Sequence, residues 1–145
     1  MSFLYPGEYI DSTYSIDFDK LYKEGYRGVI FDIDNTLVTH GSPADERAIA
    51  LFKELGFSCL VLSNNKEPRV KSFAKQLGIK YIYKAGKPKP SGYRAAMERL
   101  GTDTKNTLFV GDQIFTDIIG ANLTGIRSIL VAPIDPHEEI QIVLK

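Results

Sequence analysis

The sequence predicts an α/β fold, a three-layer sandwich in which helices cover both faces of a mainly parallel, five-stranded sheet. Two observations lead to this prediction. Short apolar runs recur along the chain, and segments with apolar residues at helical spacing lie between them. Strands that alternate with helices are joined by right-handed crossovers, which make the strands parallel. In such sheets ligands bind beyond the carboxyl ends of the strands, so functional residues are expected there.

The predicted strands are short runs rich in β-branched and other apolar residues, as buried strands are. They are 28–33, 58–63, 80–83, 107–110 and 127–131.

The predicted helices come from apolar residues at positions i, i+3, i+4 and i+7, over 70–77 and 93–100, with Ile49 and Phe52 on a third. Ser42 before Pro43 is typical of a helix start, an N-cap followed by a first-turn proline. Glycine readily takes the left-handed conformation that ends many helices. Four glycines follow helical segments and are expected to cap them: Gly56, Gly78, Gly101 and Gly125.

The composition bounds the class of protein. The 145 residues are expected to form a single domain, 1–145. Eighteen basic and eighteen acidic side chains cancel, which argues against a nucleic-acid binder that works through a general positive field. The apolar runs are far shorter than the roughly 20 residues that span a bilayer, and the first residues lack a signal-peptide pattern. Together with a single cysteine, Cys59, these features predict a cytoplasmic protein.

Two acids end the first predicted strand, in the string FDIDNT at 31–36. The alternation of a strand places Asp32 and Asp34 on one face. Such a pair can divide the work of phosphoryl transfer, because one carboxylate can attack phosphorus while the other protonates the leaving alcohol. Repulsion between the two calls for a cation. The alternative is that both acids only cap a turn and a helix.

Polar residues also follow the next two strands. Ser63 and Asn64 end the second strand, where a hydroxyl and backbone N–H groups at a helix N-terminus can bind phosphate. Lys87 follows the third strand and can stabilise negative charge in a transition state, with Lys89 as the alternative lysine. Taken singly, Ser63 could be a helix cap and Lys87 part of a solvated loop.

The fourth strand is followed by Asp112 and, five residues later, Asp117. Mg²⁺ prefers oxygen ligands, so this pair is a candidate magnesium site, although Asp112 could instead cap the next helix. All four signals follow strands of one predicted sheet. We therefore interpret them as parts of a single site.

The order of these motifs resembles the haloacid dehalogenase (HAD) superfamily over roughly residues 28–131. The resemblance implies a Rossmann-like, HAD-like fold and a magnesium-dependent phosphatase that works through an aspartyl-phosphate. It implies that Asp32 is the nucleophile and Asp34 the general acid and base, while Ser63, Asn64 and Lys87 bind the phosphate. Magnesium would be bound by the Asp32 carboxylate, the backbone carbonyl of Asp34 and the Asp112 carboxylate, with Asp117 binding it directly or through water.

Many members of this superfamily carry an inserted cap domain, and the spacing here leaves no room for one. Asp32 and Ser63 are 31 positions apart and Ser63 and Lys87 are 24 apart, enough only for the crossovers. An uncapped site is open to bulky substrates, or is closed by another subunit.

Within the superfamily, the chain is similar to the subfamily IIIA proteins of the YqeG group. The similarity rests on YPGEY at 5–9, GVIF before DIDNTLV, SNN at 63–65 and GDQIFTD at 111–117. Related eukaryotic proteins are phosphatidylglycerophosphate phosphatases, so the expected partner is a phosphorylated substrate, small or lipid.

Several alternatives stay open at this point. The chain could be a receiver-like phosphoacceptor domain or a non-catalytic scaffold with the same fold. His40 could touch a substrate or lie in solvent, and His137 has no evident partner. Four aromatic residues near the start could contact a membrane or pack over the sheet edge: Phe3, Tyr5, Tyr9 and Tyr14. Self-association also stays open.

Overall fold

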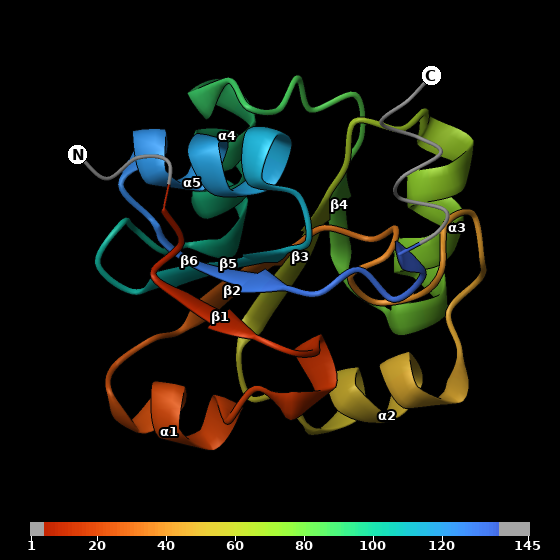
Figure 1. Cartoon of the computed structure of the whole chain (residues 1–145), viewed down its shortest axis with the longest axis horizontal. Helices are drawn as coiled ribbons and strands as arrows, with labels where there is room; N and C mark the ends of the chain where they lie inside the picture. The colour runs from red at the N-terminus through yellow and green to blue at the C-terminus, as the bar shows by residue number, and fades with distance from the viewer. Residues whose placement is uncertain (1–4, 137–145) are drawn as a thin grey trace.

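The computed structural model describes residues 5–136 and shows a three-layer α/β sandwich (Figure 1). The six strands are β1 (Glu8–Ile10), β2 (Gly28–Phe31), β3 (Ser58–Leu62), β4 (Lys80–Ile82), β5 (Thr107–Gly111) and β6 (Arg127–Val131). All neighbouring pairs are parallel, in the order β1-β6-β5-β2-β3-β4. The predicted α/β class and parallel sheet are confirmed.

The predicted number of strands was wrong, because β1 makes a sixth. It has three residues, with Tyr9 exposed, so it is too short to show an apolar run. It pairs with β6, from the other end of the chain, and local sequence carries no sign of that pairing.

Helices cover both faces of the sheet. The α-helices are α1 (Phe18–Lys23), α2 (Glu46–Glu54), α3 (Glu67–Leu77), α4 (Pro90–Leu100) and α5 (Ile119–Thr124), with a 3-10 turn η1 (Thr13–Ser15) and a π-helix η2 (Ile114–Ile118). Residues of α1 and α3 pack into one core cluster, and residues of α4 and α5 pack into a second. In Figure 1, α4 and α5 lie above the sheet and α1 and α2 below it. The apolar helical faces predicted for 70–77 and 93–100 belong to α3 and α4.

Two predicted helix boundaries were wrong. Helix α2 begins at Glu46, because the Asp45 side chain caps it by accepting a hydrogen bond from the Ala48 N–H (2.9 Å). Ser42 lies in the preceding loop, where its hydroxyl pairs with that of Thr39. The same helix ends on Leu55 in an extended conformation, so Gly56 needs no left-handed backbone. The other three glycine caps are confirmed, with positive φ at Gly78, Gly101 and Gly125.

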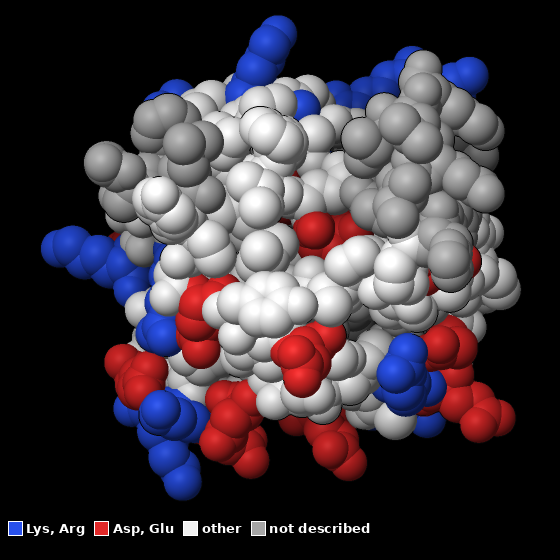
Figure 2. All heavy atoms as spheres, viewed as in Figure 1, with Lys and Arg blue, Asp and Glu red and all other residues white. Residues whose placement is uncertain are grey.

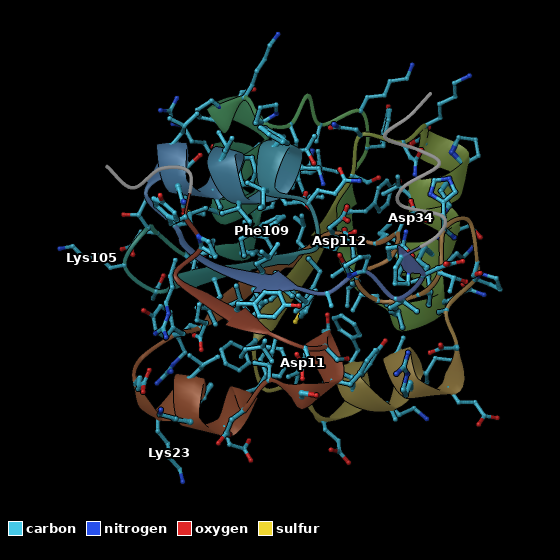
Figure 3. The ribbon with its side chains drawn as sticks, viewed as in Figure 1. Asp11, Lys23, Asp34, Lys105, Phe109 and Asp112 are labelled. Atoms are coloured by element: carbon cyan, nitrogen blue, oxygen red, sulfur yellow. The ribbon has the colours of Figure 1, made fainter. Side chains whose placement is uncertain are left out.

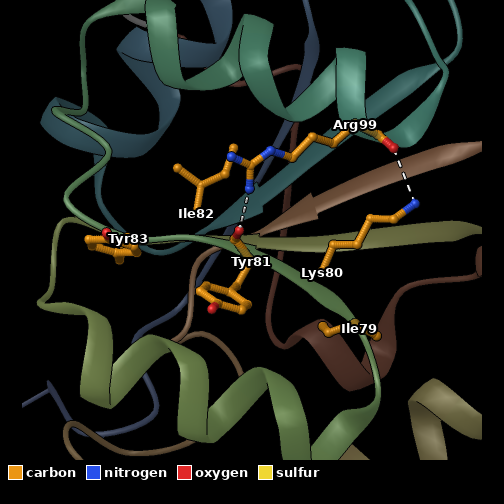
Figure 4. Close-up of a pocket in the computed structure, with 6 residues that line it drawn as sticks. All are labelled: Ile79, Lys80, Tyr81, Ile82, Tyr83 and Arg99. Carbon is orange, nitrogen blue, oxygen red and sulfur yellow. Dashed lines mark hydrogen bonds between the residues drawn. The ribbon is translucent and has the colours of Figure 1, made fainter.

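The exposed edge at β4 is partly closed by a side chain (Figure 4). Arg99, near the end of α4, donates a hydrogen bond to the Tyr81 carbonyl (2.8 Å), while Lys80 donates to the Arg99 carbonyl (3.1 Å). Unpaired edge groups can recruit a strand from another chain, and a charged side chain across the edge discourages this. The shallow hollow that these residues line lies away from the carboxyl ends of β2 and β5.

The structure also bears on the predictions for Cys59, for the aromatic residues near the start and for membrane-spanning segments. Cys59 is free and half-buried, and burial raises the pKa of its thiol to about 12, so the thiol stays neutral. Tyr5 and Tyr9 are exposed, whereas Tyr14 is half-buried and donates to the Leu37 carbonyl. Phe3 and His137 lie outside the described residues. Among residues 5–136, we find no helix that has the length and apolar character to cross a membrane.

Candidate active site

The polar residues predicted from the sequence meet at the carboxyl ends of the central strands. The strand order reverses at β2, which lies between β3 and β5, and loops that leave such strands diverge and open a crevice. A cavity of about 260 Å³ lies there. Asp34 and Asp112 are labelled at this end of the sheet in Figure 3, and Figure 2 shows acidic atoms recessed among uncharged residues. Predicted residues that line the cavity are Asp32, Asp34, Ser63, Asn64 and Lys87.

Lys87 is the buried cation of this site. Its side chain is 3% exposed, and its Nζ atom lies 2.9 Å from Asp32 Oδ1 and 2.7 Å from Asp117 Oδ1. Burial by itself would lower the pKa of Lys87, but the Asp117 and Asp32 carboxylates outweigh burial and raise it. The ammonium therefore stays charged. Lys89 is exposed and lies outside the cavity lining, so Lys87 is the lysine that the fold brings to the acids.

Three carboxylates form a group that fits a metal ion. Oxygen atoms of Asp32, Asp112 and Asp117 all lie within 4.8 Å of one another. The Thr36 hydroxyl lies 3.1 Å from Asp112 Oδ1 and 3.3 Å from Asp32 Oδ2, so it can donate its proton to either one. Burial, reinforced by the charge of Asp32, raises the pKa of Asp117 in spite of Lys87. Three acids against one ammonium leave an excess of negative charge, and an all-oxygen set without Cys or His suits Mg²⁺.

The strand β5 lets Asp117 approach because it ends in Gly111. A Cβ atom at Gly111 would lie 2.5 Å from Asp117 Oδ2 and 2.7 Å from its Cβ. The π-helix η2 then turns Asp117 back toward the sheet, and the Gln113 N–H donates to its Oδ2 (3.2 Å). π-Helical turns are often found at functional sites, and this one was not predicted.

Asp34 lies outside the acidic group, in surroundings of its own. Its Oδ1 atom accepts hydrogen bonds from the Gly41 N–H (2.8 Å) and from Arg69 Nη2 (2.8 Å). Its Oδ2 atom accepts one from Asn65 Nδ2 (2.7 Å). The two acids of the first motif therefore share a cavity but have different partners: Asp32 faces Lys87 and Asp34 faces Arg69.

The second motif, residues 63–65, lines the cavity and supports the loop that carries Lys87. The buried Ser63 hydroxyl accepts a hydrogen bond from the Asn65 N–H (3.0 Å), the local contact of a turn cap, and it also lines the cavity. The Asn64 side chain accepts from the Lys87 N–H (2.8 Å) and donates to the Lys87 carbonyl (3.2 Å). Asn64 thus holds the Lys87 loop, and its direct contact with phosphate stays a prediction.

The turn after β2 is joined to the segment that comes after β6. Asn35 has a left-handed backbone, with φ of 61°. Its carbonyl accepts a hydrogen bond from the Ile134 N–H (3.0 Å), and its side chain accepts one from the Asp135 N–H (3.1 Å). These two hydrogen bonds hold the backbone and the side chain of Asn35, which stands between Asp34 and Thr36.

Sequence reasoning missed three residues of the site, Thr36, Asn65 and Arg69. Thr36 and Asn65 stand inside the quoted motif strings, so testing each polar position of those strings could have found them. Arg69 left no signal, since an arginine in the first turns of a helix is usually solvated. His40 is exposed and also lines the cavity, so its contact with a substrate remains open.

The match to a family covers part of this site. The sequence profile of haloacid dehalogenase-like hydrolases matches residues 43–125, which include Ser63, Lys87, Asp112 and Asp117. A protein of Bacillus subtilis (strain 168) named "Probable phosphatase YqeG" is 38% identical over 136 residues, covering 91% of this chain and 79% of that protein. The chain belongs to the haloacid dehalogenase-like hydrolases. Within this family it is a phosphatase of the YqeG-like group.

Other proteins are also similar to this HAD phosphatase, in sequence or in fold. Phosphatidylglycerophosphate phosphatase 1 of Arabidopsis thaliana is 30% identical over 154 residues; the match covers 94% of this chain and 43% of that longer protein. A solved structure from Listeria monocytogenes superposes with a TM-score of 0.57 at 20% identity, covering 81% of this chain and 97% of that one. The deoxy-D-mannose-octulosonate 8-phosphate phosphatase of Haemophilus influenzae gives 0.54 at 17% identity, covering 79% and 81%. These structures share the fold.

The absence of an inserted domain also agrees with the sequence. Within residues 5–136, the connection from β2 to β3 contains α2, the connection from β3 to β4 contains α3, and neither contains a further domain.

We predict that Lys87→Met lowers the free energy of unfolding by about 3 kcal/mol in chelator at neutral pH, because removal of one partner leaves buried charge uncompensated. Urea unfolding of the purified protein measures this. Lys89→Met is the matched control and should change the free energy by less than about 0.5 kcal/mol. Equal effects of the two substitutions would contradict the central place given to Lys87.

Proposed function

We propose that the protein is a magnesium-dependent phosphomonoesterase in which Asp32 attacks phosphorus and forms an aspartyl-phosphate. The observation that carries this proposal is the convergence of Asp32, Lys87, Asp112 and Asp117 at one end of the sheet. Asp32 and Lys87 both line the cavity; the Asp32 side chain is 13% exposed, whereas the Lys87 and Asp117 side chains are buried. A substrate that enters the cavity would therefore meet Asp32 beside a fixed positive charge.

In the first step, an Asp32 oxygen forms a bond to phosphorus while the bond from phosphorus to the ester oxygen breaks. Asp34 gives its proton to the departing oxygen, which leaves as an alcohol. In the second step, Asp34 takes a proton from water, the water oxygen attacks phosphorus, and the bond to Asp32 breaks to release inorganic phosphate. Lys87 and the Ser63 hydroxyl would bind phosphoryl oxygens and stabilise their charge.

Magnesium would be held by Asp32 and Asp112, with Asp117 and the Asp34 carbonyl beside them. When bound, it supplies positive charge that offsets the repulsion between these carboxylates and a phosphate. The Thr36 hydroxyl lies between Asp32 and Asp112 and can donate its one proton to either carboxylate.

We further propose a bulky or membrane-borne phosphomonoester as the substrate. The cavity is not covered by another domain within residues 5–136, and Phe115, beside the cavity residues Gln113 and Thr116, is 77% exposed. A relative is a phosphatidylglycerophosphate phosphatase. The receiver-like and scaffold alternatives are disfavoured, because Asp32 and Asp34 follow a single strand and the matching relatives are named phosphatases. A cytoplasmic location fits the single free cysteine and stays a prediction, as does self-association.

The roles of the two acids can be separated. Asp32→Asn should abolish turnover and phosphoenzyme formation, because the attacking carboxylate is gone. Asp34→Asn should slow an alkyl phosphate by roughly 10²- to 10⁴-fold and should accumulate phosphate on Asp32, since hydrolysis lacks its base. Rapid quenching and mass measurement locate the phosphoryl group. Phosphate on another residue, or near-normal turnover by Asp32→Asn, would sink the proposal.

The metal site can be tested by measuring turnover and, independently of turnover, by measuring thermal stability. Chelation should stop turnover and Mg²⁺ should restore it. Because a ligand that binds only the folded state stabilises it, added Mg²⁺ should also raise the melting temperature of the metal-free protein. Asp112→Asn should remove most of that rise. Full activity after chelation, or an equal rise in both proteins, would contradict the proposed site.

The substrate class can be tested at Phe115. Phe115→Ser should lower kcat/KM about tenfold for a lipid phosphomonoester in anionic vesicles, because contact with the bilayer is lost. Turnover of soluble nitrophenyl phosphate should stay unchanged. Leu123→Ser is the matched control, since Leu123 is also an exposed apolar residue (52%) but lies outside the cavity lining. Equal losses in the two variants, or efficient turnover of a small sugar phosphate alone, would exclude the lipid surface.

A further inference from the structure

Arg69 joins helix α3 to the Asp34 carboxylate and to the loop that follows the first motif. It lies in the first turns of α3, directly after the 63–65 motif, and its Nη2 atom donates to Asp34 Oδ1 (2.8 Å). Its Nη1 atom donates to the Ser42 carbonyl (2.5 Å), in the loop after the first motif. One guanidinium therefore fixes the acid and the loop beside it at the same time.

The contacts of Arg69 belong to the proton-transfer side of the site. They go to Asp34, to Ser42 and to the ring of Phe73, whose centroid is 5.3 Å from the guanidinium carbon. Asp32 has a different cation, Lys87. The two acids of the first motif thus have different cations: Lys87 faces the proposed nucleophile, and Arg69 faces the proposed acid and base.

A proton donor must lie within hydrogen-bond reach of the leaving oxygen, and a displacement of about 1 Å can cost roughly 10²-fold in rate. Asp34 has three donors that hold it, and Arg69 is the charged one, so its hydrogen bond is the strongest of the three. No covering domain within residues 5–136 closes over Asp34. The core must therefore position this acid by itself.

We propose that Arg69 is the positioning residue of the acid–base group, fixing Asp34 for proton transfer while taking no part in binding the phosphate. The inference rests on the proposed function. It assigns Arg69 a role that Lys could fill only in part, because an ammonium cannot present two planar N–H groups to Asp34 and Ser42 together.

The test compares two substrates that differ in the leaving group. With an alkyl phosphate, Arg69→Gln should lower kcat about 10²-fold. With nitrophenyl phosphate the loss should be less than about tenfold, because this leaving group needs little protonation. KM should stay within about threefold for both, since the phosphate contacts are intact. Phosphate should accumulate on Asp32 during turnover of nitrophenyl phosphate, and Arg69→Lys should recover part of the alkyl phosphate rate.

Two controls make the result specific. Arg47→Gln removes an exposed arginine that also packs on an aromatic ring, that of Tyr14 (4.1 Å), and it should leave both rates unchanged. In an Asp34→Asn background, Arg69→Gln should lower kcat little further, because the effects of substituting two interacting residues do not add.

Each outcome decides the question. A rise in KM at unchanged kcat would make Arg69 a substrate-binding residue and overturn the inference. Equal losses with both substrates, or a full further loss in the Asp34→Asn background, would show that Arg69 only supports the structure. A wild-type protein that hydrolyses neither substrate would refute the proposed function and this inference with it.

Discussion

The buried charge of Lys87 is the constraint on which the rest of the site depends. An ammonium with 3% exposure is stable only if carboxylates meet it, and Asp32 and Asp117 do so from the segments after strands β2 and β5. Those acids in turn hold more negative charge than one lysine can neutralise, which creates the place for a divalent cation. Gly111, the π-helix and the Asn64 side chain all serve to bring these groups within contact distance.

The acid pair of the first motif shows how a short string can separate two functions. Asp32 and Asp34 leave the same strand two residues apart, yet one enters the Lys87 and carboxylate group and the other enters a set of neutral and cationic donors. The separation lies in the partners: Lys87 meets Asp32, whereas the Gly41 N–H, Asn65 and Arg69 meet Asp34. Nucleophile and proton donor can therefore be tuned by different neighbours.

The sequence was informative where a site residue lies directly after a strand. The acids, Ser63, Lys87 and Asp112 were predicted together because parallel strands end at a common edge, and periodicity predicted α3 and α4. It was uninformative where distant segments meet. Strand β1 exists only by pairing with β6, Asp45 replaces Ser42 as a cap because of loop geometry, and Arg69 reaches Asp34 across 35 positions. Composition and periodicity carry no record of such contacts.

The position of β6 between β1 and β5 has a consequence for how the chain is made. Among the strands of residues 5–136, β1 is made first and β6 last, so β1 has no partner in this sheet until β6 has been made. The turn at Asn35 likewise receives its hydrogen bonds from Ile134 and Asp135 only after β6 has been made. A nascent chain would thus contain every motif residue, up to Asp117, before it contained β6 and the contacts of Asp135 that finish the site. The site should therefore become active only when contacts between residues about 100 or more positions apart have formed. Contacts between residues so distant in the sequence make folding slow.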